Sequence, residues 1–352
     1  MRRISATSIK HTGPIRDMLF PGSQKGGVPM YEWHRQIQTI LEEIDACIRR
    51  RDDEALTLRS LAGRLGYSEF HMTKQFHAIT GLSLRTYLRT RRLAFALIEV
   101  RDTQRRLIDI ALDYGFSSHE AFTRAFKTEY GVTPAAYRRQ PVAVALRTRV
   151  NAFDRYAFGM EEIGMVKSSG QINVYFTTIP AHKLLYIRNN RSNGYWDFWQ
   201  HHESIPGQDC HTICGLLDSI PGKLDDMGSG DISSGAGQIM AYESAEDGGK
   251  FDCYPVPRYE CYGCRLPTDY DGPVPEQMLL RDVPEGAYVV FEHGPFDYEQ
   301  ENCSVACAID EAQKAFEWDK TDYEFDPSTG RISYFYHDPE RYWKELWPVR
   351  KK

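Results

Sequence analysis

Apolar residues along the first 140 positions recur at helical spacing, and no segment there alternates as a strand would. From Tyr31 to about Arg50 they fall on one helical face, and helical patterns continue to about Arg139. Residues 1–29 show neither period and are rich in Gly, Pro, Ser and charge. We therefore expect a loose leader over residues 1–29 and an all-α domain over residues 30–140.

After Gly170 the pattern changes to alternating runs of aromatic and β-branched residues, which predict strands. Residues 141–170 hold only a weak helical piece around Phe153–Phe158, so we expect a linker there and an α+β domain over residues 171–352. Helical segments are expected around Trp196–His202 and Ser304–Phe316. The predicted strands are Ile172–Thr178, Lys183–Ile187, Arg258–Arg265, Ala287–His293 and Ile332–Tyr336.

Two stretches of the helical half repeat one another. Residues 61–68 (LAGRLGYS) match residues 110–117 (IALDYGFS), and further on Phe76, Gly81, Ser83 and Tyr87 match Phe126, Gly131, Thr133 and Tyr137. Each copy predicts a helix, a tight turn with a glycine able to take positive φ, and a second helix with a hydroxyl N-cap, which is Ser117 or Ser118 in the second copy. Each copy is thus a helix–turn–helix unit.

A second helix that exposes polar and basic side chains early on its free face suits the major groove of DNA. One such unit also occurs as a plain corner of helical bundles. Here a predicted helix from Ser83 to about Val100, about 27 Å long at 1.5 Å per residue, joins two units. It can therefore hold two recognition helices about 34 Å, one DNA turn, apart. Its arginines Arg85, Arg89 and Arg92, with Arg91 adjacent, either contact DNA or form only a solvated face.

Composition supports a two-domain protein that meets a polyanion. The 352 residues are 41% apolar and 26% charged, without the ~18 uninterrupted apolar residues of a membrane span or a secretory stretch, so we expect a cytoplasmic protein with reduced thiols. Residues 1–150 carry 25 Lys and Arg against 15 Asp and Glu, and the remainder carries 18 against 34. The basic half is the one that would approach DNA.

The helical half resembles the DNA-binding domain of AraC/XylS-type transcription regulators. The resemblance covers about 110 residues and rests on the motifs Ile108–Ala111, Gly115–Ser118, Arg124–Lys127, Gly131–Pro134 and Tyr137-Arg138, together with Phe122. It implies recognition helices at Ser68–Ile79 and Ser118–Thr128. The implied DNA-contacting residues are Phe70, Thr73, Lys74, His119, Glu120, Thr123 and Arg124, and Arg89 of the joining helix is a further candidate for DNA contact. Lys74 stands where the family often has arginine, so a bidentate guanine contact is not expected there.

The back half contains a fainter repeat, in which Ile179–Tyr186 parallels Val283–Val290. This half resembles the GyrI-like effector-binding domain, on the motifs Val283–Gly286, His293–Phe296 and Trp347–Arg350. The resemblance implies two pseudo-symmetric βαββ-type halves that enclose a small-molecule pocket. The expected fold is thus multidomain, with an all-α double helix–turn–helix domain followed by this α+β domain.

Aromatic residues supply a candidate wall for that pocket, although each ring could equally fill the core. Trp196 and Trp199 share one face of a helix, and Tyr259, Tyr262 and Phe291 belong to strands expected beside it. The expected ligand-binding residues are these five together with Lys344 and Glu345. Strand alternation puts Glu345 with Trp343 and Trp347 on one face and Lys344 on the other, so the charge of the ligand stays open.

Metal and cofactor sites are not expected. Cys261 and Cys264 lie three apart in a predicted strand and point to opposite faces, whereas Cys303 and Cys307 have the spacing of helix packing. Cys210 and Cys214 are the third cysteine pair whose spacing could suggest a zinc site. No phosphate-binding loop, dinucleotide fingerprint, zinc-protease motif or nucleophile elbow is present.

The favoured hypothesis is a ligand-responsive transcription regulator and not an enzyme. Its expected partners are double-stranded promoter DNA, a small amphipathic or aromatic effector and RNA polymerase, which it would contact as an activator; a homodimer is compatible with this. The alternative is a small-molecule hydrolase that uses Glu260, Glu292 or Glu345 with a tyrosine as acid–base pair. A sequestering module without a genetic role is the third option.

Overall fold

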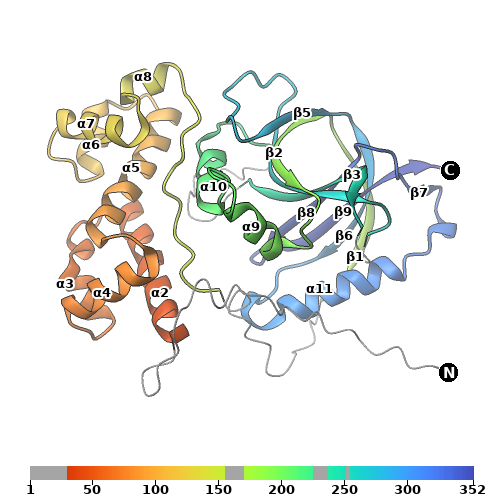
Figure 1. Cartoon of the computed structure of the whole chain (residues 1–352), viewed down its shortest axis with the longest axis horizontal. Helices are drawn as coiled ribbons and strands as arrows, with labels where there is room; N and C mark the ends of the chain where they lie inside the picture. The colour runs from red at the N-terminus through yellow and green to blue at the C-terminus, as the bar shows by residue number, and fades with distance from the viewer. Residues whose placement is uncertain (1–29, 155–169, 225–236, 251–253) are drawn as a thin grey trace.

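The computed structural model describes residues 30–154, 170–224, 237–250 and 254–352, which form a helical domain and a sheet domain (Figure 1). The expected leader over residues 1–29, and most of the expected helical piece at 153–158, lie outside the described residues. Among the described residues no helix is long and apolar enough to cross a membrane.

The helical domain closely follows the predicted pattern. Its apolar stripes pack into one core that includes Ile37, Leu61, Phe76, Leu97 and Phe126. The helices are α2 (Met30–Arg50), η1 (Glu54–Leu56), α3 (Leu58–Arg64), α4 (Glu69–Thr80), α5 (Leu84–Asp102), α6 (Leu107–Asp113), α7 (His119–Tyr130) and α8 (Pro134–Arg139).

The sequence repeat is a structural repeat of two helix–turn–helix units, α3–α4 and α6–α7, carried by α5. Gly66 and Gly115 turn the chain at φ 70° and 75°, where a side chain would be strained. Ser68 and Ser118 cap α4 and α7 by accepting hydrogen bonds from backbone N–H groups. The matched rings also repeat, since Phe76 packs edge-on to Tyr87 at 5.5 Å and Phe126 to Tyr137 at 5.9 Å.

Residues 141–154 run between the domains without helix or strand, and we call them the strap. Val144, Leu146 and Ala152 are buried in the core of the helical domain. The strap also lies along helix α10 (Cys210–Ser219) of the other domain, because the Val144 N–H donates to Ser219 Oγ at 3.1 Å. The strap is therefore a packed part of both domains.

The second domain is a nine-stranded antiparallel sheet curved into a half-barrel. Along its main path the order is β1-β6-β9-β8-β3-β4-β2-β5, and β7 pairs with β9. The strands are β1 (Asn173–Ile179), β2 (His182–Asn189), β3 (Ile239–Gly249), β4 (Arg258–Leu266), β5 (Leu279–Val283), β6 (Gly286–His293), β7 (Tyr323–Phe325), β8 (Ile332–Asp338) and β9 (Tyr342–Lys351).

Three α-helices cover one face of the sheet. Helices α9 (Tyr195–Glu203) and α10 (Cys210–Ser219) pack over β2, β3 and β4, whereas α11 (Tyr298–Lys314) packs over β6 and β9; a short turn η2 (Trp318–Lys320) follows α11. Side chains on the opposite face, contributed by all of the long strands, form one separate core. The sequence patterns missed α10, β3, β5 and β7.

Candidate functional site

The outer face of α4 is exposed over the three positions that the sequence singled out. Phe70 is 80% exposed, an unusual position for a large apolar ring. Thr73 and Lys74 are also exposed, although the Thr73 hydroxyl donates to the Glu69 carbonyl at 2.8 Å and so leaves its methyl group as the free part. The face therefore offers an apolar ring, a methyl group and one cation.

Buried residues hold α4 in place from behind. Met72 and Phe76 lie in the core at helical spacing. Trp33 of α2 contacts Tyr67 at 4.5 Å and His71 at 4.8 Å, between ring centroids. This aromatic contact fixes the start of the helix, where the exposed Phe70 lies.

The outer face of α7 has a different chemistry. Glu120 and Arg124 are exposed, four residues apart on one face, whereas His119 and Thr123 are half-buried. The Thr123 hydroxyl oxygen is enclosed and has no hydrogen-bond partner in the described chain. The pKa of Glu120 is lowered by hydrogen bonds from its own backbone N–H and the Ser118 hydroxyl, so an ionised carboxylate lies beside the guanidinium.

The arginines of α5 do not form the uniform outward face that their spacing suggested. Arg89 is exposed but pairs with Glu129 of α7 at 3.4 Å. Arg92 pairs with Asp53 at 2.6 Å. Arg91 is fully buried and donates to both carboxylate oxygens of Asp45. The solvated-face interpretation is thus wrong for Arg91 and Arg92, which bind α5 to preceding elements.

Both recognition helices remain accessible next to the sheet domain. Figure 1 shows α3, α4, α6 and α7 on the side of the helical domain that faces away from the sheet, with the strap on the opposite side. Phe70, Lys74, Glu120 and Arg124 are all exposed in the presence of the second domain. The face is open without any rearrangement of the chain.

The predicted aromatic wall is divided among separate places in the sheet domain. Trp199 and Tyr262 meet edge-on at 4.8 Å under α9, and Trp196, half-buried, neighbours Tyr195 at 5.1 Å. Phe291 instead packs with Trp347 at 5.6 Å under α11. The rings are apart because β4 and β6, which carry Tyr262 and Phe291, belong to opposite ends of the sheet.

Tyr259 lies on the other face of the sheet from Tyr262. Its hydroxyl donates to Asp247 at 2.7 Å, and Arg188 stacks over its ring at 4.1 Å. Tyr259 and Tyr262 are three positions apart in one strand, so their side chains point to opposite faces of the sheet. The prediction that both rings belong to one wall is therefore wrong.

Glu345 and Lys344 divide between the two faces as strand alternation predicted. Glu345 lies on the helix-covered face, where it accepts hydrogen bonds from Gln313 of α11 at 2.7 Å and from the Trp343 indole at 3.3 Å. Desolvation raises its pKa. Lys344 pairs with Glu292 at 3.0 Å on the opposite face. A carboxylate, and not an ammonium group, thus lies among the tryptophans.

A buried arginine between the two aromatic groups escaped the sequence analysis. The Arg258 guanidinium stacks over the rings of Tyr242 at 4.0 Å and Tyr254 at 4.6 Å. Tyr254 contacts Trp347 at 6.1 Å, which places the arginine near the α11 group as well. The pairing of β3 with β4 brings Tyr242 to Arg258, so local sequence carries no signal for that contact.

The acid–base candidates differ in how their oxygens are used. Glu260 is fully buried and accepts from the Ser192 hydroxyl at 2.7 Å and the Gly194 N–H at 2.9 Å, in addition to Arg258. Burial raises its pKa, and its hydrogen bonds hold the turn before α9. Glu292 accepts from the Tyr175 hydroxyl at 2.7 Å near an edge strand. Glu260 therefore acts as a structural anchor.

The structure also shows where the cysteines considered as zinc ligands lie. Cys261 and Cys264 lie in the two different cores on opposite sides of β4, as alternation predicted. Cys210 and Cys214 approach to 3.7 Å between sulfur atoms on α10. Within the described ranges, no group of three or more His, Cys, Asp or Glu side chains is arranged to hold a metal ion.

Comparison with known proteins places the helical domain in a well-populated family. A model described as a helix-turn-helix domain matches residues 61–140. Regulatory protein SoxS of Salmonella typhimurium is 39% identical over 108 residues, which are 30% of this chain and 97% of that protein. Right origin-binding protein of Escherichia coli K12 is 44% identical over 89 residues, 25% of this chain and 31% of that protein. The match thus spans under a third of this second relative.

Solved structures resemble each domain only loosely. A transcriptional regulator from Chromobacterium violaceum described as AraC-type is 26% identical, with a TM-score of 0.27, over 30% of this chain and 96% of that one. The EcmrR C-terminal domain is 12% identical, with a TM-score of 0.30, over 51% of this chain and 99% of that one. Likenesses at these scores assign no function.

Proposed function

Because the chain belongs to the AraC family of transcription regulators, we propose that it is a sequence-specific DNA-binding regulator controlled by a small molecule. The observation that carries this proposal is the pair of exposed recognition helices, α4 and α7, built on one repeated unit and joined by one continuous helix. Helix α5 has 19 residues, about 28 Å at 1.5 Å per residue, which suits successive major grooves about 34 Å apart once the flanking turns are included.

The two helices would read different base chemistry. On α7, Arg124 can donate two hydrogen bonds to guanine, and Glu120 can accept one from the amino group of cytosine. On α4, Phe70 and the Thr73 methyl group suit the methyl group of thymine, while Lys74 suits a phosphate. Arg89, half-exposed beside Glu129, and the half-buried His119 and Thr123 would support these contacts from the edges.

For the sheet domain we propose a GyrI-like effector-binding role. The strand order supports two related halves, since β2-β4-β3 repeats the connectivity of β6-β9-β8, with β5 added beside β2 and β1 beside β6. The helix-covered face carries Trp196, Trp199 and Tyr262 in one half and Phe291 with Glu345 in the other. Glu345 would bind an amphipathic aromatic cation by exchanging the hydrogen bonds that it accepts from Gln313 and the Trp343 indole for contact with the ligand. Lys344 would then act only through Glu292 on the opposite face.

Helix α10 offers a route from that face to the DNA-binding domain. His211, Gly215 and Ser219 form one stripe along the strap, and a Cβ on Gly215 would lie 2.3 Å from the Leu146 carbonyl oxygen. Arg101 of α5 donates to the Ser219 carbonyl at the end of α10 at 2.9 Å. A ligand that shifts α10 would therefore act on both the strap and α5, in proportion to its differential affinity for the two states.

We include transcription activation through RNA polymerase in the proposal, with promoter DNA as the target. A homodimer is not required for a two-groove contact, because one chain carries both recognition helices. The hydrolase alternative gains no support from Glu260, whose oxygens are already hydrogen-bonded within the domain.

The proposal is tested with duplexes selected from a random-sequence pool by the full chain. We expect a selected sequence, and an affinity that falls with salt in a log–log plot with a clearly negative slope. Arg124→Ala should remove preference at one position of the selected sequence. A slope near zero, or no sequence preference, would overturn DNA-binding regulation.

The effector role is tested separately by titrating tryptophan fluorescence with tetraphenylphosphonium and with neutral triphenylphosphine oxide as a matched control. We expect the cation to bind more tightly, and Glu345→Gln to remove that difference. Equal affinity for the two compounds in the unmodified protein would overturn the role of Glu345.

A further inference from the structure

Arg51 has an unusual backbone conformation between the first helix and the first helix–turn–helix unit. It follows α2 directly with φ 59°, and among the described residues it is the only one besides glycines with positive φ. A side chain in this region costs about 1–2 kcal/mol, and glycine usually occupies the position after a helix. A strained arginine at a helix end indicates that its side chain has a use.

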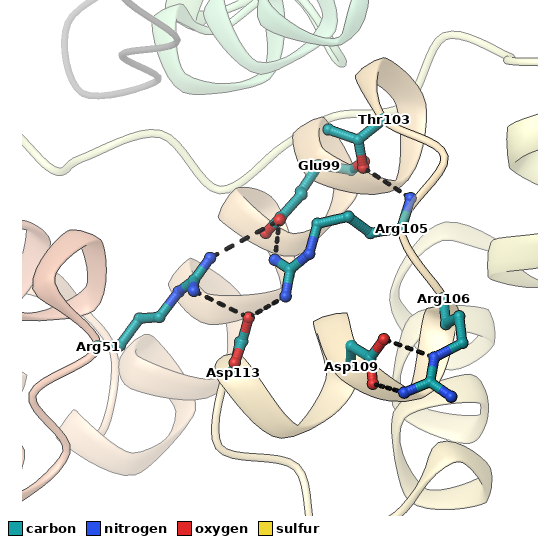
Figure 2. Close-up of polar contacts among 7 residues, drawn as sticks. All are labelled: Arg51, Glu99, Thr103, Arg105, Arg106, Asp109 and Asp113. Carbon is teal, nitrogen blue, oxygen red and sulfur yellow. Dashed lines mark hydrogen bonds and ion pairs between the residues drawn. The ribbon is translucent and has the colours of Figure 1, made fainter.

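That side chain reaches into the second unit. Its guanidinium contacts Asp113 of α6 at 3.0 Å and Glu99 of α5 at 3.7 Å. Arg105, in the loop between α5 and α6, pairs with Asp113 at 2.5 Å and also with Glu99. Figure 2 shows the four side chains converging, with the two guanidiniums and two carboxylates alternating. We call Arg51, Glu99, Arg105 and Asp113 the quartet.

Another contact of the second unit lies nearby. Its turn glycine, Gly115, lies against the ion pair between Arg92 of α5 and Asp53, which precedes the first unit. A Cβ on Gly115 would lie 2.7 Å from Arg92 Nη1 and 3.0 Å from Asp53 Oδ2. Two groups of charged residues therefore join parts of the domain that are otherwise connected through α5.

Helix α5 fixes the distance between the two recognition helices, whereas the rotation of the second unit about the axis of α5 depends on the contacts around that helix, namely the shared hydrophobic core and the quartet. Arg51 contacts Asp113 of α6 from the end of α2, and Arg105 contacts the same carboxylate from the loop after α5. Because the quartet is partly exposed, each ion pair contributes only about 0–1 kcal/mol to stability. Its main effect is on geometry.

We propose that the quartet sets the rotation of α7 relative to α4 and so selects the spacing between the two half-sites of the DNA. The residues are positioning residues, since none of them lies on a recognition helix. The inference rests on the proposed function, because spacing has a meaning only if both helices bind one duplex. Half-sites one DNA turn apart demand matched rotation as well as distance.

The test uses Arg51→Gly and Asp113→Asn in the full chain. Glycine accepts positive φ, so the first variant removes the side chain while relieving strain. Asp113→Asn removes the carboxylate shared by both arginines and leaves Arg51 in place. The control is Arg106→Gln, which removes a more exposed ion pair (Arg106 to Asp109, 2.8 Å) that lies wholly within the second unit (Figure 2).

Each protein is titrated against the duplex selected by the unmodified chain and against versions with one or two base pairs inserted or deleted between the half-sites. We expect the unmodified protein and Arg106→Gln to prefer the selected spacing at least tenfold. Arg51→Gly and Asp113→Asn should prefer it less than threefold, with an unchanged salt slope, because a lost phosphate contact would reduce that slope by about 1.

The outcomes are separable. Absence of any selected sequence overturns the proposed function itself. Binding that is indifferent to spacing in the unmodified protein, or preserved spacing preference in Arg51→Gly and Asp113→Asn, overturns the role of the quartet alone. A reduced salt slope in Arg51→Gly would show a phosphate contact instead, and would likewise overturn it.

Discussion

The two helix–turn–helix units share a backbone and matching aromatic contacts, but they differ in the polar groups beside them and in their outer faces. The first unit is tied to α2 and α5 next to a buried ion pair, Arg91 with Asp45, whose oxygen and nitrogen lie 2.6 Å apart. No such buried ion pair adjoins the second unit among the described residues, where Phe126 of α7 packs against Tyr137 of α8 at 5.9 Å. The outer faces also differ, since that of α4 is largely apolar and that of α7 is charged.

This contrast shows where the sheet domain can act. Arg91 also donates to the Arg147 carbonyl of the strap, and Arg147 contacts His211 of α10. Helix α5 is therefore connected to α10 by a chain of polar contacts that starts at the buried ion pair. At its C-terminal end, α5 meets the sheet domain through Arg101.

The largest expected effect is on stability. Asp45→Ala leaves the buried Arg91 without its carboxylate, and we expect a loss of about 3–5 kcal/mol in the free energy of unfolding. Glu129→Ala, which breaks the half-exposed pair with Arg89, should cost no more than about 1 kcal/mol. Urea unfolding followed by circular dichroism measures both. Equal losses would show that the buried pair is no special anchor.

The next effect concerns the charged reading face. Arg124→Ala should weaken binding to the selected duplex by about 1–3 kcal/mol and relax the preference at one base pair. Lys127→Ala, on the same helix, serves as the control for loss of charge, and it should weaken all sequences alike. Titration against single-base variants of the duplex measures the difference. Unchanged discrimination in Arg124→Ala would reassign the reading residue.

A smaller effect follows from pH. Burial, and then the charge of Arg147, lowers the pKa of His211 to about 4, against about 6.5 in an unfolded chain. The folded protein holds the neutral imidazole, so stability is lost as pH falls from about 6.5 towards 4, by roughly 1–2 kcal/mol at pH 5. Thermal unfolding at pH 7 and 5 measures this loss. His211→Gln should show a smaller one, and an equal loss would locate the titration elsewhere.

The smallest effect is expected on the apolar reading face. Lys74→Gln should weaken binding to all duplexes alike, by less than about 1 kcal/mol, and reduce the salt slope by about 1. Phe70→Ala provides the contrast, because it should leave the slope unchanged and affect only sequences with thymine at its position. A sequence-dependent loss in Lys74→Gln would mean that Lys74 reads a base.

The sequence predicted the helical domain well because its signals are local. Glycines at the turns, hydroxyl caps and apolar stripes all lie within a few residues of the feature that they specify. Arg91 shows the limit, because its partner Asp45 lies 46 residues earlier and turns an apparently outward arginine into a buried one. Spacing along one helix carries no information on that partner.

In the sheet domain the missed elements depend on distant packing. Helix α10 contains Gly215, a poor helix former, which is required because the strap backbone approaches it closely. Strand β5 is only five residues long and gains its place by pairing with β2. For the candidate site, alternation predicted the faces of Glu345 and Lys344, but the grouping of the rings depends on strand order, which local patterns do not give.

The order of the strands in the sheet has a consequence for how the protein folds. Strand β1 follows the strap but pairs with β6, and β6 in turn pairs with β9, so the sheet closes only after residues more than a hundred positions apart have met. Such long-range pairings form slowly, whereas helical bundles form fast. In a nascent chain, the helical domain would therefore fold before the sheet domain had gained its last strand.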